Sequence, residues 1–335
     1  MPRPHQIEFV NYICKFGREK SLLDLAYEVV LPAYEPKRYK RDIRKASYFF
    51  HDVDLLEWKE GENVILCLVG RIIKNTTLER EQVFSDDGGL IEDHLAIESA
   101  PSAIFALILN NHKLLYLKET AYAPDVNVFR ATSQYVLRKA HTDFLNRKYE
   151  LLMEGGSKVK KKDLRAEFPS PTVEAIPLSS EGTLADFVDQ FSVLKAVETK
   201  LVITNDELDL DDLFLNIRGS MDEIGANQTT LRHQNPEGLS LDAAKDQLSS
   251  AAAQGNTKIK LRGKDKIGDD LSGNNEKFSL RVSFDKTAKE LSTIAMDMYN
   301  TYVGLIKDNV LSIPDTISAT QKKILQLRER ISSDE

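Results

Sequence analysis

The chain has 335 residues, of which 41% are hydrophobic and 29% charged, and its formal net charge is −7 at pH 7. This composition is typical of a soluble globular protein, and the length suffices for two hydrophobic cores. The N-terminal residues lack the apolar stretch of a signal peptide, no apolar run approaches the roughly 18 residues of a membrane span, and two cysteines cannot form a disulfide framework. We therefore expect a cytoplasmic protein without a membrane anchor, in which Cys14 and Cys67 are reduced and buried.

Most of the first half is predicted to form strands, and one long helix follows them. Runs rich in β-branched and aromatic residues indicate strands over residues 6–16, 46–50, 64–73, 90–99, 103–109 and 113–118. Residues 21–30 fit a short helix that Pro32 ends, and Asn110-Asn111 suits a hairpin turn. The hydrophobic period then changes, and Asp125 is a suitable N-cap for a helix that extends to about Leu152.

Residues 154–171 have the composition of a linker, with two glycines, a charged run and a Pro-Ser-Pro sequence. Residues 1–150 hold 21 basic and 22 acidic side chains, and the rest of the chain holds 24 and 30, so the second half contributes most of the acidity. We expect four parts, which are a β-rich domain over 1–153, the linker over 154–171, an α/β domain over 172–312 and a helical tail over 313–335.

Strands and helices alternate in the second half. The predicted strands are 172–178, 200–203, 228–233, 257–262 and 279–284, and the predicted helices are 183–194, 208–221, 240–253, 285–310 and 316–331. This order predicts a two-layer α/β sandwich with its helices on one face. The chain is therefore expected to be an α+β protein, with a β-rich N-terminal sheet closed by one long helix, then the sandwich and a C-terminal helix that packs on the core or reaches a partner.

A short basic run near the N-terminus is the most informative local feature. Residues 37–45 hold six cations in nine positions, and aromatic residues lie within and just after this run. In a chain of negative net charge such a concentration favours contact with an anion, and a solvated surface is the other interpretation. Tyr39 and Tyr48 could stack on nucleic-acid bases. The candidate nucleic-acid-binding residues of this run are Lys37, Arg38, Tyr39, Lys40, Arg41, Arg44 and Lys45.

A second group of cations alternates with apolar residues along two predicted strands. If strands 257–262 and 279–284 pair, and helices cover only one face, the open face carries Lys258, Lys260, Arg262 and Arg281, and Arg232 could join them. Such a face would suit a phosphate backbone or an acidic partner, while solvated lysines and arginines are the simpler interpretation.

The chain contains no recognisable catalytic signature. Residues 263–276 hold three glycines and two asparagines, which favours a flexible hairpin loop over an anion-binding nest. Carboxylates and a histidine near Gly88-Gly89 could hold a divalent cation, but their spacing matches no metal motif, and a polar turn is favoured. These residues are Asp86, Asp87, Glu92, Asp93 and His94. We predict no metal and no cofactor, and we identify no catalytic residue.

Three segments of the second half resemble an uncharacterised bacterial family, designated domain of unknown function 4747. The segments are Pro171–Leu178 (PTVEAIPL), Leu201–Glu207 (LVITNDE) and Gly238–Asp242 (GLSLD). The similarity spans about residues 100–310 and rests on patterning. It implies a β-rich half followed by an alternating half, and it implies no active-site residues. Families of this kind often accompany mobile or phage-defence genes, so the resemblance also implies a part in bacterial antiviral defence.

The residues support three hypotheses for function. The first is a non-enzymatic binding module that engages nucleic acid through its local basic patches. The second is an assembly or sensor subunit that uses the acidic second domain and the tail to bind a protein partner or a second copy. The third is a metal-dependent, nuclease-like hydrolase that uses the carboxylates at 86–93 and His94.

Overall fold

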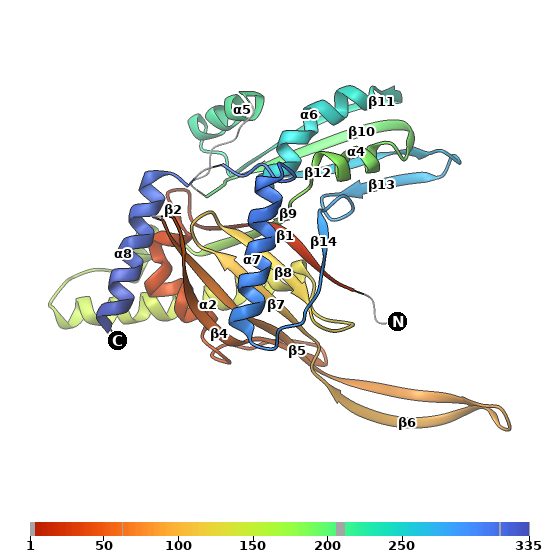
Figure 1. The fold of residues 1–335 in the computed structure, drawn as a ribbon. Helices are drawn as coiled ribbons and strands as arrows, with labels where there is room; N and C mark the ends of the chain where they lie inside the picture. Colours follow the sequence, from red (N-terminus) through yellow and green to blue (C-terminus); the bar gives the residue numbers. More distant parts are fainter. Residues whose placement is uncertain (1–3, 62, 206–211, 315, 335) are drawn as a thin grey trace.

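The structure is a computed structural model that describes residues 4–61, 63–205, 212–314 and 316–334. It is an α+β protein, as predicted, with a large curled antiparallel sheet, a long helix, a second four-stranded sheet and C-terminal helices (Figure 1). The described strands are β1 His5–Phe16, β2 Lys20–Ser21, β3 Arg41–Ile43, β4 Ala46–Glu60, β5 Asn63–Ser85, β6 Gly89–Ser99, β7 Ser102–Ile108, β8 Lys113–Lys118, β9 Pro171–Pro177, β10 Phe191–Val202, β11 Gln228–Leu239, β12 Thr257–Asp265, β13 Asp270–Asn274 and β14 Arg281–Phe284. The α-helices are α1 Leu31–Tyr34, α2 Val126–Glu154, α3 Lys161–Glu167, α4 Glu181–Val188, α5 Asp212–Glu223, α6 Leu241–Gln254, α7 Leu291–Lys307 and α8 Ser318–Asp334. Residues 22–30, predicted as a short helix, form a 3-10 turn and a π-helical turn before α1.

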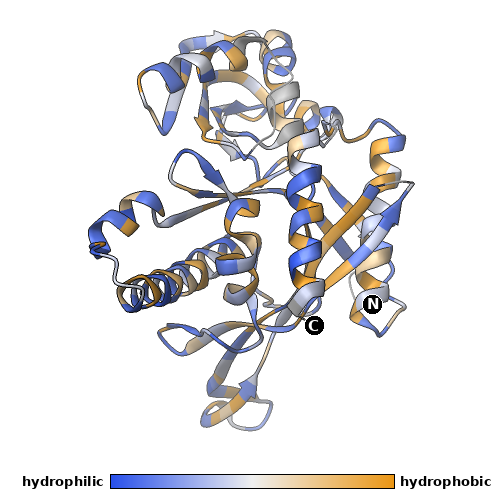
Figure 2. Ribbon diagram, turned by 90° about the vertical axis from the view of Figure 1, so that its left-hand side faces the viewer, coloured by the Kyte–Doolittle hydropathy of each residue, from blue (hydrophilic) through white to orange (hydrophobic). Residues whose placement is uncertain are grey.

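The first sheet has the strand order β14-β1-β8-β7-β5-β4-β3, and β2, β9 and β6 pair at its margins. Its two faces support separate cores. One core packs the sheet against α2 and α8 and contains a cluster of aromatic rings around Phe129 and Phe105, 5.2 Å apart. The other packs the sheet against α7, where the only tryptophan, Trp58, lies 4.9 Å from the ring of Tyr299. In Figure 2 the strands behind the C-terminal helix are largely hydrophobic, whereas that helix itself is mostly hydrophilic.

The tail helix α8 packs on the protein's own core. Ile324 and Leu327 are buried, and Arg328 pairs with Glu57 of β4 at 2.6 Å. The sequence predicted a C-terminal helix that either packs on the core or reaches a partner, and the described part of α8 packs on the core. No described helix is long and apolar enough to cross a membrane.

The second sheet has the order β11-β10-β12-β13, and α4, α5 and α6 supply the helical residues of its core, as a sandwich with helices on one face requires. Two predicted elements differ from the structure. The helix expected over 183–194 ends at Val188, and Phe191 and Leu194 belong to the long strand β10. The N-cap is Ser180, three residues before the predicted start of this helix, because the Ser180 hydroxyl accepts a hydrogen bond from the Thr183 amide. Residues 206–211, the start of the helix predicted over 208–221, lie outside the described residues.

The second sheet is an insertion into one edge of the first. β9 and β14, which the predicted boundaries placed in the second domain, both pair with β1. The chain leaves this edge after β9 and returns to it before β14, and the Leu280 amide donates a hydrogen bond to the Leu178 carbonyl at 2.8 Å. Only residues between these two positions form the second sheet, while α7 and α8 pack on the first. The segment predicted as a linker contains α3, which packs against α2.

A buried polar cluster fastens the inserted unit to the first sheet. The side-chain amide of Asn11 on β1 donates hydrogen bonds to the Asn256 side chain at 2.8 Å and to the Gly255 carbonyl at 3.2 Å. The Asn11 side-chain oxygen accepts a hydrogen bond from the Lys113 ammonium at 3.0 Å. Asn205 covers the neighbouring part of β1, because its side chain bonds the Tyr12 carbonyl and the backbone amide of residue 14. Hydrogen bonds between these buried polar groups therefore fix the position of the inserted unit relative to the first sheet.

A second polar cluster holds the loop before α7. Glu119, at the end of β8, accepts hydrogen bonds from Lys286 at 2.6 Å, from Ser102 at 2.8 Å and from Arg71 at 3.1 Å. Burial raises the pKa of the Glu119 carboxyl, but the hydrogen bonds from Lys286 and Ser102 and the charges of Arg71 and Lys286 outweigh burial and lower it below its usual value. The folded protein thus stabilises the ionised form of Glu119 more than the protonated form.

Candidate nucleic-acid interface

The basic run forms the loop before β3 and the hairpin between β3 and β4. Arg44 adopts a left-handed backbone conformation at the hairpin turn, with φ of 52°. Lys37, Lys40 and Arg44 are exposed, whereas Arg41 is half-buried and its guanidinium lies 3.5 Å from the Thr132 hydroxyl on α2. The structure therefore places these cations at the edge of the first sheet, next to the long helix.

Tyr39 anchors this loop to α2. Its hydroxyl donates a hydrogen bond of 2.6 Å to the Asp143 carboxylate, and its ring packs against the core under the helix. Burial and the hydrogen bond to Asp143 raise the pKa of the Tyr39 hydroxyl, despite the nearby Arg38 guanidinium. In this arrangement Tyr39 holds the loop in place, and its ring is committed to the interior rather than to a base.

The helix α2 and the segment up to the end of α3 continue the positive surface. Lys161 on α3 donates a hydrogen bond to Asn146 of α2 at 3.2 Å, and the ring of His141 bonds the Phe168 carbonyl at 2.9 Å. Because Asn146 lies one turn beyond Asp143, the basic loop and α3 flank one stretch of the helix. We call residues 35–45 and 126–167 together the basic face.

The basic face has a charge opposite to that of the whole chain. It holds 16 lysines and arginines against seven aspartates and glutamates, a net of +9 in a chain of −7. Within the described part of the chain, only Arg38 and Lys45 of these 16 cations have an acidic partner within 4 Å, which are Glu35 and Glu79. Fourteen cations are thus left without a neutralising carboxylate among the described residues, so the face is suited to binding an anion from outside.

Aromatic rings lie beneath several of these cations. The Lys148 ammonium is 4.8 Å from the centre of the Phe168 ring, and the Lys161 ammonium is 5.0 Å from that of Tyr149. Lys139 has the same relation to Tyr135 at 5.6 Å. These contacts restrain the stems of the cations and leave their charged ends at the surface.

The second predicted basic surface differs from the first in its charge balance. Lys258 pairs with Glu174 at 2.8 Å, and Lys260 lies 3.9 Å from Glu198. Arg262 is exposed on the same face of the second sheet. This face of the second sheet therefore carries three of the predicted cations, but nearby carboxylates neutralise the charges of Lys258 and Lys260.

The predicted pairing of strands 257–262 and 279–284 is wrong. β12 pairs with β10 and β13, whereas β14 pairs with β1 in the first sheet. Arg281 therefore lies apart from the other three residues and binds Glu8 at 2.7 Å. The segment 263–276, predicted as a flexible hairpin loop between these strands, instead contains the end of β12 and the strand β13, joined by a short turn. In that turn the Asp265 carboxylate accepts the amide hydrogens of residues 267 and 269.

The carboxylates proposed for a metal-dependent hydrolase lie at the far end of the β5–β6 hairpin. Asp86 and Asp87 are in its turn, and Asp93 is bound to Arg80 on the opposite strand. No group of three potential metal ligands converges anywhere among the described residues, which include all five of these side chains. Among the described residues, these side chains therefore form no cluster of metal ligands.

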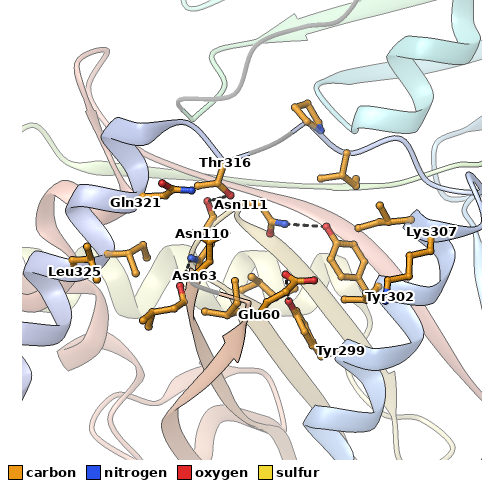
Figure 3. A pocket seen from close by; sticks show the side chains of 18 residues that line it. Glu60, Asn63, Asn110, Asn111, Tyr299, Tyr302, Lys307, Thr316, Gln321 and Leu325 are labelled. Carbon is orange, nitrogen blue, oxygen red and sulfur yellow. Dashed lines mark hydrogen bonds between the residues drawn. The ribbon is translucent and has the colours of Figure 1, made fainter.

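A cleft of about 540 Å³ lies between α7, α8 and the start of β5 (Figure 3). Its polar groups largely bond each other, since the Tyr299 hydroxyl donates to Glu60 at 3.0 Å and Asn111 donates to the Tyr302 hydroxyl at 3.0 Å. Burial and Glu60 raise the pKa of the Tyr299 hydroxyl, so this group stays protonated at neutral pH. No nucleophile paired with a base is present among the lining residues that the structure describes, and we assign no reaction to this cleft.

Comparison with protein-family models and with curated proteins finds no match to this chain. The basic face is therefore defined by the chain's own geometry alone. Sequence reasoning found its first part, residues 37–45, but missed the cations of α2 and α3. A detectable signal was present there, because residues 126–167 hold ten basic and five acidic side chains.

Proposed function

We propose that the protein is a nucleic-acid-binding module that holds the phosphate backbone on its basic face. The observation that carries this proposal is the set of 14 cations without an acidic partner among the described residues, gathered on one surface of an acidic chain. Such a surface releases counterions when phosphates replace them, which drives binding without regard to base sequence. A role in bacterial antiviral defence, as the family resemblance implies, is compatible with such a module.

The arrangement favours backbone contact over base stacking. Tyr39, Tyr135 and Tyr149 lie under or beside cations instead of forming an exposed stacking platform. The 29 residues of α2 span about 43 Å, because a helix rises 1.5 Å per residue. One helical turn of a duplex rises about 34–36 Å, so a helix of this length spans slightly more than one turn of duplex.

The test is the binding of a fluorescein-labelled duplex, followed by anisotropy at salt concentrations from about 50 to 200 mM. A variant with Lys139→Ala, Arg147→Ala, Lys161→Ala and Lys162→Ala removes four exposed cations of the basic face. We expect weaker binding and a salt slope that is smaller by about 3.6, since each of the four lost phosphate contacts contributes about 0.9. Arg38 and Arg41 are left unchanged because they also contact Glu35 and Thr132.

The matched control is Lys258→Ala with Lys260→Ala on the second sheet, where each lysine has a carboxylate partner. We expect this control to bind like the unmodified protein. The proposal is refuted if the unmodified protein does not bind the duplex at the lowest salt concentration, or if the four-site variant binds with unchanged affinity and slope. A control that loses affinity as strongly as the four-site variant would move the site to the second sheet.

A further inference from the structure

Residues 77–98 form an arm that extends away from the body of the protein. They are the outer parts of β5 and β6, which pair with each other from Thr77 opposite Glu98 to Ser85 opposite Gly89. Figure 1 shows this two-stranded ribbon projecting beyond the sheet, on the side opposite to α3. With a rise of about 3.3 Å per residue, nine residues reach about 30 Å.

The arm exposes large apolar side chains along its whole length. Of the 15 large hydrophobic side chains that are exposed among the described residues, six lie on the arm: Leu78, Phe84, Leu90, Ile91, Leu95 and Ile97. Leu78 lies opposite Ile97, and Phe84, which is 73% exposed, lies opposite Leu90. A two-stranded ribbon is only marginally stable alone in water, and a concentration of exposed apolar groups marks an interaction surface.

The arm is also strongly acidic. It holds seven aspartates and glutamates and one arginine, a net of −6 over 22 residues. Arg80 binds Asp93 within the arm, and Glu79 at its base binds Lys45 of the basic face at 2.6 Å. The contact between Glu79 and Lys45 shows that the two charged regions already attract each other where the fold brings them together.

We propose that the arm of one copy binds the basic face of a second copy. The charges are complementary, with −6 on the arm and +9 on the face. The face also exposes apolar side chains that could cover those of the arm, namely Ile43, Leu151 and Met153. The basic face thus offers both positive charge and apolar surface, which match the negative charge and the exposed apolar side chains of the arm.

Two other binding partners for the arm fit less well, namely its own basic face and the arm of a second copy. The outer part of the arm points away from α3 and cannot lie along its own basic face (Figure 1). Pairing of two arms would bring two charges of −6 together, which opposes association. The interface is therefore heterologous, with arm and face on different surfaces, and repeated contacts of this kind close into a ring or continue as a filament.

The arm also occupies the surface proposed for nucleic acid, so the two compete. This competition rests on the proposed function, whereas the self-association does not. The two are separated experimentally, because self-association is measured on the protein alone and duplex binding is measured on a variant without the arm.

The test measures the mass in solution by sedimentation at low and high salt, against a monomer mass of 37.9 kDa. In the arm-deleted variant, Asn-Gly replaces residues 78–97 and joins Thr77 to its partner Glu98 through a tight turn. Two further full-length variants reverse charge. One carries Asp86→Lys, Asp87→Lys and Glu92→Lys on the arm, and the other carries Lys161→Glu, Lys162→Glu and Arg165→Glu on the face.

We expect the unmodified protein to associate at low salt and to dissociate as salt is raised. Each of the three variants alone should associate at least tenfold more weakly. An equal mixture of the two charge-reversed variants contains one reversed surface of each kind, so the intact arm of one should bind the intact face of the other. That mixture should stop at a 1:1 dimer, because the three changes bring the net charge of its remaining arm from −6 to 0 and that of its remaining face from +9 to +3, so these two surfaces are no longer complementary.

The arm-deleted variant should bind duplex at least as tightly as the unmodified protein. The proposal is overturned if the unmodified protein stays monomeric at low salt, or if the arm-deleted variant associates normally. It is also overturned if the face-reversed variant still associates alone, which would indicate contact between arms. Circular dichroism spectra that match the unmodified protein's are the check that each variant is folded.

Discussion

The Asn11→Ala substitution should weaken the attachment of the inserted sheet more than its small change in volume suggests. Asn11 is fully buried and makes three hydrogen bonds, to Asn256, to the Gly255 carbonyl and to the Lys113 ammonium. A neutral buried hydrogen bond contributes about 1 kcal/mol and one to a charged group about 1.5–3 kcal/mol, so the loss should be about 3–5 kcal/mol. That is a large part of the 5–15 kcal/mol by which domains are typically stable.

The assay is urea unfolding followed by two probes. Trp58 fluorescence reports on the first sheet, where the indole packs on Tyr299, and far-ultraviolet circular dichroism reports on the whole chain. We expect the midpoint to fall, and the dichroism transition to begin before the fluorescence transition as the inserted unit detaches first. The control is Asn75→Ala, an exposed asparagine on β5 whose replacement should cost less than about 0.5 kcal/mol. A loss below about 1 kcal/mol for Asn11→Ala would refute the inference that this cluster fastens the two units.

Two further substitutions have expected outcomes. Gly273→Ala should cost about 1–3 kcal/mol in thermal unfolding, because its new Cβ would lie 2.2 Å from the Phe187 ring. Gly219→Ala is its control: nothing lies within 4 Å and the residue is in a helix, so this change should stabilise by up to about 1 kcal/mol, and equal effects at both positions would contradict the packing argument. The lowered pKa of Glu119 means that its stabilisation is present above the carboxyl's unfolded value of about 4.3 and is lost as pH falls through the folded value. Glu119→Gln should therefore flatten the acid side of the plot of unfolding free energy against pH, and an unchanged profile would contradict this assignment.

Local signals in the sequence predicted several elements correctly. Asp125 caps α2 by accepting a hydrogen bond from the Val128 amide, as expected, and Ser240 and Gly255 bound α6. The C-terminal glycine has the left-handed conformation that this position favours, with φ of 65°. These features depend on a few neighbouring residues, which explains why the sequence alone was sufficient.

The strand β10 was partly predicted as helix because its apolar residues fit both periods. Phe187, Phe191 and Leu194 are spaced as on a helical face, but Phe191 and Leu194 lie in a strand that two neighbours flank and whose register is irregular at this end. Pairing with β11 and β12 decides the outcome, and the partner of Leu194 on β11, Leu239, lies 45 residues further along the chain. Tertiary contact therefore overrides the local pattern here.

The candidate site was predicted only in its contiguous part. Residues 37–45 are recognisable because their cations are neighbours in the chain, whereas the ten cations from α2 to α3 are spread over 36 residues, from Arg130 to Arg165. The arm was recognised only on its β6 side, because residues 74–82 of β5, after the predicted end at Ile73, are charged or polar apart from Leu78 and show no apolar run. The fold separates the acidic arm from the basic face in space. The net charge summed over residues 1–150 is close to zero and does not reveal this separation.

Because the second sheet is inserted between β9 and β14, the first sheet can be completed only after the inserted residues have been made. β1 is made first, yet its edge is filled by β9 and by β14, and His5 pairs with Phe284. The mean sequence separation of contacts in this sheet is therefore large, which slows folding. During synthesis residues 10–16 of β1 stay unpaired at this edge until β9 is made, and residues 5–8 until β14 is made at residues 281–284 of 335, and an unpaired edge is prone to aggregation. We expect slow refolding and a dependence on chaperones during expression, properties that follow from where the second sheet enters the first.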